Sequence, residues 1–249
     1  MNTSKIAAQL YTVRDFTKTA KDFEDTLKKL KAIGYNAIQV SAIGPIDYKE
    51  VKKIAVSLDM KICATHSPFD RMKNDLKNLI DEHKEWGCDY IGLGSMPGDF
   101  RKNYEEFIKI IRPIANEIAQ SGLKFVYHNH KFEFEKSNGK NFFEIIAENT
   151  NPSEVGFLVD TYWVQAGGYS PQVFISKFSD RIDVIHLKDM QIIDDAITMA
   201  EVGEGNMDWQ PIIKVCEDID VKWYAVEQDT CYRDPFESLK MSFENIKKW

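Results

Sequence analysis

The sequence predicts a single (β/α)8 TIM barrel, an α/β fold in which eight parallel strands alternate with helices. Its 249 residues match the usual size of such a barrel. Short apolar runs alternate with longer amphipathic segments from one end of the chain to the other, a pattern typical of parallel α/β folds. No Pro/Ser-rich linker or abrupt change of composition divides the chain, so we expect one domain over residues 1–249.

The eight apolar runs are the predicted barrel strands. They comprise residues 5–12, 36–42, 61–66, 90–95, 124–130, 155–160, 183–189 and 222–228. Each has the length and apolar character of a strand that is covered on both faces.

Helices are predicted between these strands. Before the second strand, Phe23, Leu27, Leu30 and Ile33 fall on one helical face. Glycines that can adopt the left-handed C-cap conformation end several of the helices, namely Gly34, Gly87 and Gly122. The least regular parts are the loop at 91–105 and the stretch 190–208, where the pattern leaves room for a small insertion.

Composition limits the partners and the compartment. A formal net charge of −7 and a pI of about 5.4 disfavour nucleic acid, because neutralising its phosphates requires clustered Lys and Arg. The four cysteines are scattered without a Cys-x-x-Cys pair, which favours a reducing compartment over a disulfide framework. We find no signal peptide and no apolar run of membrane-spanning length. We therefore expect a cytoplasmic protein without a nucleic-acid or membrane partner, and a homo-oligomer is left open.

Polar residues gather at the predicted strand ends, where barrels of this kind place their active sites. They are Gln9, Tyr11, Gln39, His66, His128, Asn129, His130, Glu133, Asp160, His186, Lys188, Asp189, Glu227 and Asp229. Carboxylates and imidazoles without thiolates suit one divalent metal, which would be Mn, Mg, Co or a catalytic Zn. The sequence therefore predicts a metal site at the carboxyl-terminal mouth of the barrel.

Structural explanations compete with the site assignment at several positions. His66 fits a hydrogen-bonded structural group as well as it fits a site residue. His83 falls on a polar helical face and is expected to be solvated. Trp163 and Trp209 serve packing as readily as they line a pocket. The segment 203–205 lacks the phosphate-loop pattern, so we expect a mobile loop with glycine hinges.

The order and spacing of several motifs resemble a known family. These motifs are QLYTVRD, YHNHKFEF, VDTYW, HLKDM, VGEGNMDW and YAVEQD, and together they span nearly the whole chain. They are similar to the xylose isomerase-like barrels, which include sugar and sugar-phosphate isomerases, ketose 3-epimerases, inosose dehydratases and hydroxypyruvate isomerases.

The resemblance implies one divalent metal held by residues after strands five to eight. Asp160, His186 and Glu227 match the last three positions. The fifth-strand ligand is His128 if the strands are aligned, or Glu133 if the family's Asn-Arg-Phe-Glu pattern is matched. We prefer Glu133, because it keeps three carboxylates and one imidazole.

The resemblance also implies a mechanism, in which the metal stabilises an enediolate. Glu133 and Glu227 would be the catalytic pair that moves a carbon-bound proton. The residues implied for substrate binding are His66, His128, His130, Trp163 and Lys188. Two positions depart from the epimerases of the family: Trp163 replaces a histidine, and only Lys188 is available where many members carry an arginine.

These features predict a metal-dependent isomerase or epimerase that acts on a sugar, sugar phosphate or keto-sugar. The alternative within the enzymes is an inosose-type dehydratase, because the same enediolate chemistry can end in loss of a hydroxyl. A different class is a sugar-binding or metal-binding barrel without catalysis. An abasic-site endonuclease is disfavoured by the acidic charge and by the lack of histidines after strands four and six.

Overall fold

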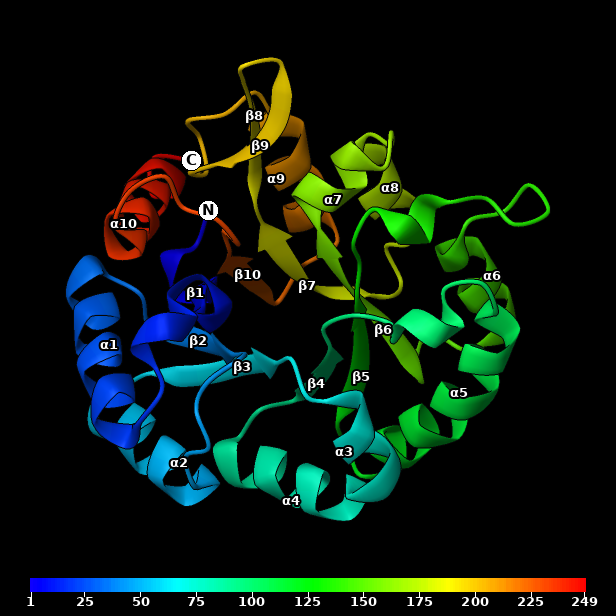
Figure 1. Ribbon diagram of the computed structural model, residues 1–249, viewed down its shortest axis with the longest axis horizontal. Coiled ribbons are helices and arrows are strands. Elements are labelled where there is room, and N and C mark those ends of the chain that lie inside the picture. The colour runs from blue at the N-terminus through cyan, green and yellow to red at the C-terminus, as the bar shows by residue number, and fades with distance from the viewer.

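The computed structural model describes residues 1–249 and shows a ring of eight parallel strands enclosed by helices (Figure 1). The barrel strands are β1 (Ile6–Gln9), β2 (Ala37–Val40), β3 (Lys61–Thr65), β4 (Tyr90–Leu93), β5 (Lys124–His128), β6 (Val155–Asp160), β7 (Ile182–Leu187) and β10 (Trp223–Val226). Each strand overlaps one of the eight predicted runs, so the predicted barrel is confirmed.

The strands follow the order β3-β2-β1-β10-β7-β6-β5-β4, with every paired neighbour parallel. The first and last barrel strands meet where Ala8 pairs with Val226. At the remaining seam, between β3 and β4, the backbone N–H of Ser67 donates to the carbonyl of Gly92 over 2.7 Å. A side chain at Gly92 would place its Cβ 2.1 Å from the Thr65 carbonyl oxygen, so glycine permits this close approach. The barrel is therefore nearly closed.

Helices cover the outside of the ring (Figure 1). They are α1 (Ala20–Ile33), α2 (Tyr48–Ser57), α3 (Phe69–Asn74), α4 (Leu76–Trp86), α5 (Tyr104–Gln120), α6 (Phe142–Asn149), α7 (Thr161–Ala166), α8 (Pro171–Lys177), α9 (Trp209–Asp218) and α10 (Pro235–Ile246). In α1, Thr19 and Asp22 form a capping box, and the predicted apolar face is buried at Phe23, Leu27 and Leu30. Gly34 ends this helix with φ of 127°, as its C-cap role requires.

The apolar core has two parts that follow the alternation of side chains along the strands. A large outer cluster fills the space between the strands and the helices. A small inner cluster fills the barrel itself and consists of Ala7, Ala37, Cys63, Ala64, Tyr90, Val126, Leu158, Val184 and Ala225. Many of the inner residues are small, because eight strands converge on a narrow interior.

An antiparallel hairpin follows β7 within the stretch where the sequence left room for an insertion. It consists of β8 (Asp189–Ile193) and β9 (Ala196–Ala200). Its two turn residues, Asp194 and Asp195, have φ of 49° and 63°, which Asp tolerates better than most residues. Figure 1 shows the hairpin at the rim of the barrel, near α9 and the chain ends.

Four short 3-10 segments complete the chain, at Thr3–Lys5, Leu10–Phe16, Gly98–Phe100 and Phe132–Phe134. The termini lie together, since the Met1 ammonium donates to the Trp249 carbonyl (Figure 1). Among the helices, none combines the length and the apolar character needed to cross a membrane.

Candidate active site

The strand alternation that builds the inner core also builds the candidate site. Side chains two residues apart on a strand point to the same side. Four inner apolar residues are each followed, two positions later, by a polar residue at the carboxyl end of the strand: Val126 by His128, Leu158 by Asp160, Val184 by His186 and Ala225 by Glu227. These polar side chains therefore meet inside the mouth of the barrel.

His128, Asp160, His186 and Glu227 form a buried cluster whose ligand atoms lie within 4.8 Å of one another. His186 Nδ1 is 2.9 Å from Glu227 Oε2 and 3.7 Å from Asp160 Oδ2. His128 Nε2 lies 3.5 Å from the same oxygen of Asp160. Two imidazoles and two carboxylates at this spacing can hold a metal ion.

Second hydrogen bonds orient both imidazoles toward the cluster. His128 Nδ1 lies 2.9 Å from the Gly94 carbonyl, so this nitrogen carries the proton and Nε2 is free to act as a ligand. His186 Nε2 lies 2.7 Å from Gln39 Oε1, which directs Nδ1 inward in the same way. His128 Nε2 is buried without a hydrogen-bond partner, as an atom prepared for a metal ion would be.

Asp160 joins the strand, the cluster and the next helix. It ends β6, and its Oδ1 caps α7 by accepting from the Trp163 N–H over 3.0 Å. The Asn129 side chain accepts from the Asp160 N–H over 2.9 Å. Oδ2 is thereby left facing the cluster.

The Lys188 side chain is buried beside the cluster. Its Nζ lies 3.0 Å from Asp160 Oδ2, 2.8 Å from Glu227 Oε2 and 3.0 Å from Asp229 Oδ2. Burial alone would lower the pKa of Lys188, but these carboxylates outweigh it and raise the pKa well above its ordinary value. Burial would likewise raise the pKa of Asp160 and Glu227, yet Lys188 and the histidines hold both well below their usual range. The buried charges of Lys188 and of the carboxylates therefore stabilise one another.

The rings of His66 and His130 lie beside His128, and Trp163 lies beside His130. The rings of His66 and His130 lie 4.8 Å and 4.9 Å from that of His128, and Trp163 lies 5.5 Å from His130. Burial lowers the pKa of His66 well below its ordinary value and that of His130 to about 3. Both imidazoles are therefore neutral near pH 7.

Glu133, the predicted fourth ligand, is not brought into the cluster. Its Oε1 accepts from the Tyr127 hydroxyl over 2.7 Å, and its Oε2 accepts from the His130 N–H over 2.9 Å. Tyr127 precedes His128 and so points out of the barrel, where its ring packs against Phe142. Glu133 is therefore buried in the helical layer. The fifth strand contributes His128 to the cluster in its place.

One further prediction from the sequence needs correction. His83 is fully buried, not solvated, with Nε2 2.8 Å from Thr65 Oγ1 and Nδ1 2.7 Å from the Leu79 carbonyl. Burial lowers its pKa to about 4. The histidine lies on the buried face of α4, because that helix packs over the end of β3.

Asp189 has a structural surrounding that the sequence did not reveal. Its carboxylate accepts from the backbone N–H groups of Gly203 and Gly205 and from the Trp209 indole, over 2.8, 3.2 and 2.7 Å. The glycine-rich loop at 203–205 is thus hydrogen-bonded to Asp189, the residue after Lys188. Trp209 contributes to this group of hydrogen bonds and does not line the cavity.

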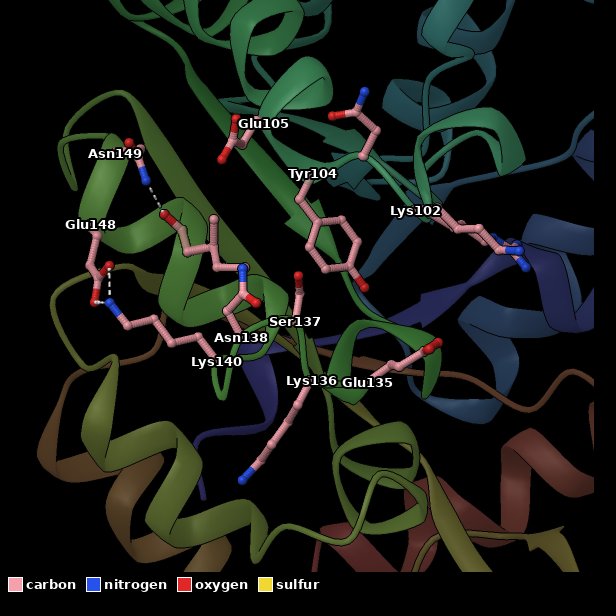
Figure 2. A pocket seen from close by; sticks show the side chains of 13 residues that line it. Lys102, Tyr104, Glu105, Glu135, Lys136, Ser137, Asn138, Lys140, Glu148 and Asn149 are labelled. Carbon is pink, nitrogen blue, oxygen red and sulfur yellow. Dashed lines mark hydrogen bonds and ion pairs between the residues drawn. The ribbon is translucent and has the colours of Figure 1, made fainter.

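A cavity of about 430 Å³ opens onto the cluster. It is lined by Tyr11, Ser41, Ala42, His66, Gly94, Ser95, His128, His130, Glu227 and Asp229. A second, larger hollow of about 720 Å³ lies between the start of α5, the loop at 135–140 and α6 (Figure 2). Lys140 and Glu148 form an ion pair at 2.7 Å in its lining, and it contains none of the predicted site residues. The candidate site therefore opens into the smaller cavity.

A parallel barrel with imidazoles and carboxylates at the carboxyl ends of its strands belongs to the class of barrels that place a metal or substrate at that mouth. Residues 27–248 match the family model of the xylose isomerase-like TIM barrel. This chain belongs to that family.

Known proteins are similar to this chain over most of its length. Inosose dehydratase of Geobacillus kaustophilus is 23% identical over 270 residues, covering 90% of this chain and 86% of that protein. A sugar phosphate isomerase/epimerase from Parabacteroides distasonis has a TM-score of 0.82 at 23% identity, covering 99% of this chain and 94% of that one. The probable 3-DHS dehydratase of Bacillus anthracis has a TM-score of 0.75 at 14% identity, covering 98% of each chain. The barrel is thus shared by proteins named for different reactions.

Proposed function

We propose that this chain is a dehydratase that removes water from a keto-polyol of the inosose type, a cyclic ketone with several hydroxyl groups. Curated relatives named inosose dehydratase align with 90% and 100% of the chain. The sequence predicts dehydration as the alternative to isomerisation and epimerisation. The following features of the site support this alternative.

The position of Glu133 is the observation that favours dehydration over epimerisation. Epimerisation by the implied mechanism needs Glu133 and Glu227 on opposite faces of the substrate. Glu133 faces Tyr127 in the helical layer instead, so this pair is not assembled at the cavity. Elimination needs no second face, because one group can accept the carbon-bound proton and return it to the departing hydroxyl.

The lining of the cavity favours a substrate without phosphate. Glu227 and Asp229 are its charged carboxylates, and its lining residues include neither Lys nor Arg. The nearby Lys188 ammonium is already matched by three carboxylates. Hydroxyl groups suit such a surface better than a phosphate, which needs uncompensated positive charge.

A divalent ion held by His128, Asp160, His186 and Glu227 would supply the Lewis acidity that makes the proton beside a ketone removable. His66 is arranged to donate a hydrogen bond to the substrate. The Gln9 amide nitrogen, 3.4 Å away, faces His66 Nδ1, so the proton of the ring is on Nε2, which is buried and has no protein partner. His66 would therefore hold a substrate oxygen at the entrance of the cavity.

His130 is the proposed proton carrier. Its imidazole is kept neutral by burial, and its Nδ1 has no hydrogen-bond partner. In the proposed step His130 accepts the proton from the carbon beside the ketone, a carbon–carbon double bond forms, and the carbon–oxygen bond to the next hydroxyl breaks. The same proton then leaves with that hydroxyl as water, which returns His130 to its neutral form.

The test is product analysis with Mn²⁺ and 2-keto-myo-inositol as the substrate. We expect a product lighter by the mass of one water, with the ultraviolet absorbance of a conjugated enone or dione. His130→Gln should lower turnover by at least about 10²-fold, the usual contribution of a general acid or base. Glu244→Gln, on an exposed face of α10, is the control and should keep full turnover. A product of unchanged mass would instead establish isomerisation, and no conversion of any keto-polyol would support the non-catalytic class.

A further inference from the structure

We infer that Lys188 competes with a divalent cation for the carboxylates of Asp160 and Glu227, and that its ammonium withdraws to Asp229 when the cation binds. This assignment rests on the metal cluster of the proposed function and adds a built-in competitor to it. The contacts of the lysine carry it.

The lysine and the cluster use the same two oxygen atoms. Lys188 Nζ lies 3.0 Å from Asp160 Oδ2 and 2.8 Å from Glu227 Oε2. His186 Nδ1 approaches these two atoms to 3.7 Å and 2.9 Å, and His128 Nε2 approaches them to 3.5 Å and 4.0 Å. A cation bound by the two imidazoles and the two carboxylates therefore shares its oxygen ligands with the ammonium.

The distances place two positive charges close together. Metal–oxygen bonds are about 2.0–2.2 Å long, so a cation on Glu227 Oε2 would lie within about 5 Å of a stationary Lys188 Nζ. Lys188, Asp160 and Glu227 are all buried, which leaves little water to screen the repulsion. A lysine that stays in place must weaken the binding of the cation.

Asp229 offers the Lys188 ammonium an alternative ion-pair partner. Its Oδ2 is 3.0 Å from Lys188 Nζ, and its side chain is 27% exposed, so it lies nearer to solvent than the other two carboxylates. The backbone of Lys188 is fixed on both sides, because its N–H donates to Thr161 Oγ1 over 3.1 Å and its carbonyl accepts from the same hydroxyl over 2.9 Å. Withdrawal therefore takes place by rotation of the side chain alone.

Calorimetric titration with Mn²⁺ alone, without substrate, tests the competition. Lys188→Met removes the charge and keeps most of the length, and it should bind Mn²⁺ at least about 10-fold more tightly than the native chain, in keeping with the loss of a close like charge. Lys124→Met is the matched control, since Lys124 pairs with Asp183 at the other end of the barrel strands. Its Mn²⁺ affinity should equal that of the native chain. Unchanged or weaker binding by Lys188→Met, or no binding by any of the three proteins, would overturn the inference.

A double-mutant cycle tests the role of Asp229. Asp229→Asn should weaken Mn²⁺ binding in the native background, because the ammonium loses its alternative partner. In the Lys188→Met background the same change should have a clearly smaller effect. Equal effects in the two backgrounds would show that Asp229 does not act through Lys188.

Crystal structures of the native chain with and without Mn²⁺ give a second measurement, which does not depend on the folding of a variant. With Mn²⁺ bound, Lys188 Nζ should lie beyond hydrogen-bond distance from Asp160 and Glu227 and should still contact Asp229. Unchanged lysine contacts beside a bound Mn²⁺ would contradict the competition. The titrations contain no substrate, so their failure and the failure of the dehydration assay are separate results.

Discussion

At the scale of single residues, His128 and Glu133 show how strand alternation assigns a role. Both fit the fifth-strand ligand by motif, and conserving the number of carboxylates favoured Glu133. In the structure Tyr127 points out of the barrel toward the helices. Glu133 accepts a hydrogen bond from the Tyr127 hydroxyl and is therefore held in the same layer. Counting alternate positions from the inner residue Val126 leads instead to His128.

Glu133→Gln should remove a contribution to the free energy of unfolding that depends on pH. Burial raises the pKa of Glu133 from 4.5 to about 7, so between these values the folded chain keeps a proton that the unfolded chain has lost. The stability this proton provides is complete below about pH 4.5 and is lost as the pH rises through about 7, a change of about 3 kcal/mol. The Gln variant should lack this slope.

Urea unfolding of both proteins at several pH values from about 5 to about 8 measures that slope. Mn²⁺ affinity of the variant should match that of the native chain, because Glu133 is outside the cluster. A variant that loses Mn²⁺ binding while folded would return Glu133 to the ligand set.

Glu227→Gln should damage both activity and stability. The Glu227 carboxylate accepts from Gln9 over 2.6 Å and faces Lys188 and His186, so its loss takes one of three carboxylate partners from the buried Lys188 ammonium. We expect turnover to fall by at least about 10²-fold and the free energy of unfolding to fall by about 3 kcal/mol. Enzyme assays and denaturant unfolding check the two effects against Glu244→Gln. Full turnover in the Glu227 variant would remove it from the site.

At the scale of elements, the seam between β3 and β4 depends on one glycine. Gly92 allows the Thr65 carbonyl to approach where any side chain would collide. The sequence run at 90–95 predicted the strand, but a glycine within it gave no sign of which neighbour comes so close. That information belongs to the pairing of strands, which local patterns do not encode.

Gly92→Ala should therefore open or strain this seam. The added Cβ would lie 2.1 Å from the Thr65 oxygen, and we expect the free energy of unfolding to fall by about 3 kcal/mol. Gly98→Ala is the control, because a Cβ at Gly98 meets nothing within 4 Å and should change stability by less than about 0.5 kcal/mol. Denaturant unfolding compares the two. Equal stability of both variants would mean that the seam can widen freely.

At the scale of the whole molecule, the barrel was predictable because every strand run is strongly apolar and every helix carries an apolar face. The positions of Asp160, His186 and Glu227 followed from where those runs end. The contacts among charges did not, since Lys188 reaches carboxylates from two other strands. His83 was misjudged because a short helical pattern does not show which turn lies over a neighbouring strand end.

Binding of a metal ion to the folded cluster should stabilise the whole barrel, because the unfolded chain does not assemble the four ligands. At a free Mn²⁺ concentration of about 100 times its Kd, the gain is about 2.7 kcal/mol. For a chain of this size that raises Tm by roughly 5–10 °C. Thermal unfolding with Mn²⁺ and with a chelator measures the change. His186→Gln should abolish it, and a Tm rise that survives this substitution would place the ion elsewhere.

The attachment of the glycine-rich loop to Asp189 has a consequence for how such a barrel can diversify. Both ends of the β8–β9 hairpin return to the same place, because Asp189 begins it and also holds Gly203 just beyond it. A segment closed at its base can change its length or sequence while the barrel below stays unaltered. The exposed tip, with Ile192 and Ile197 uncovered, is thus the part of this mouth that is freest to change from one descendant to another.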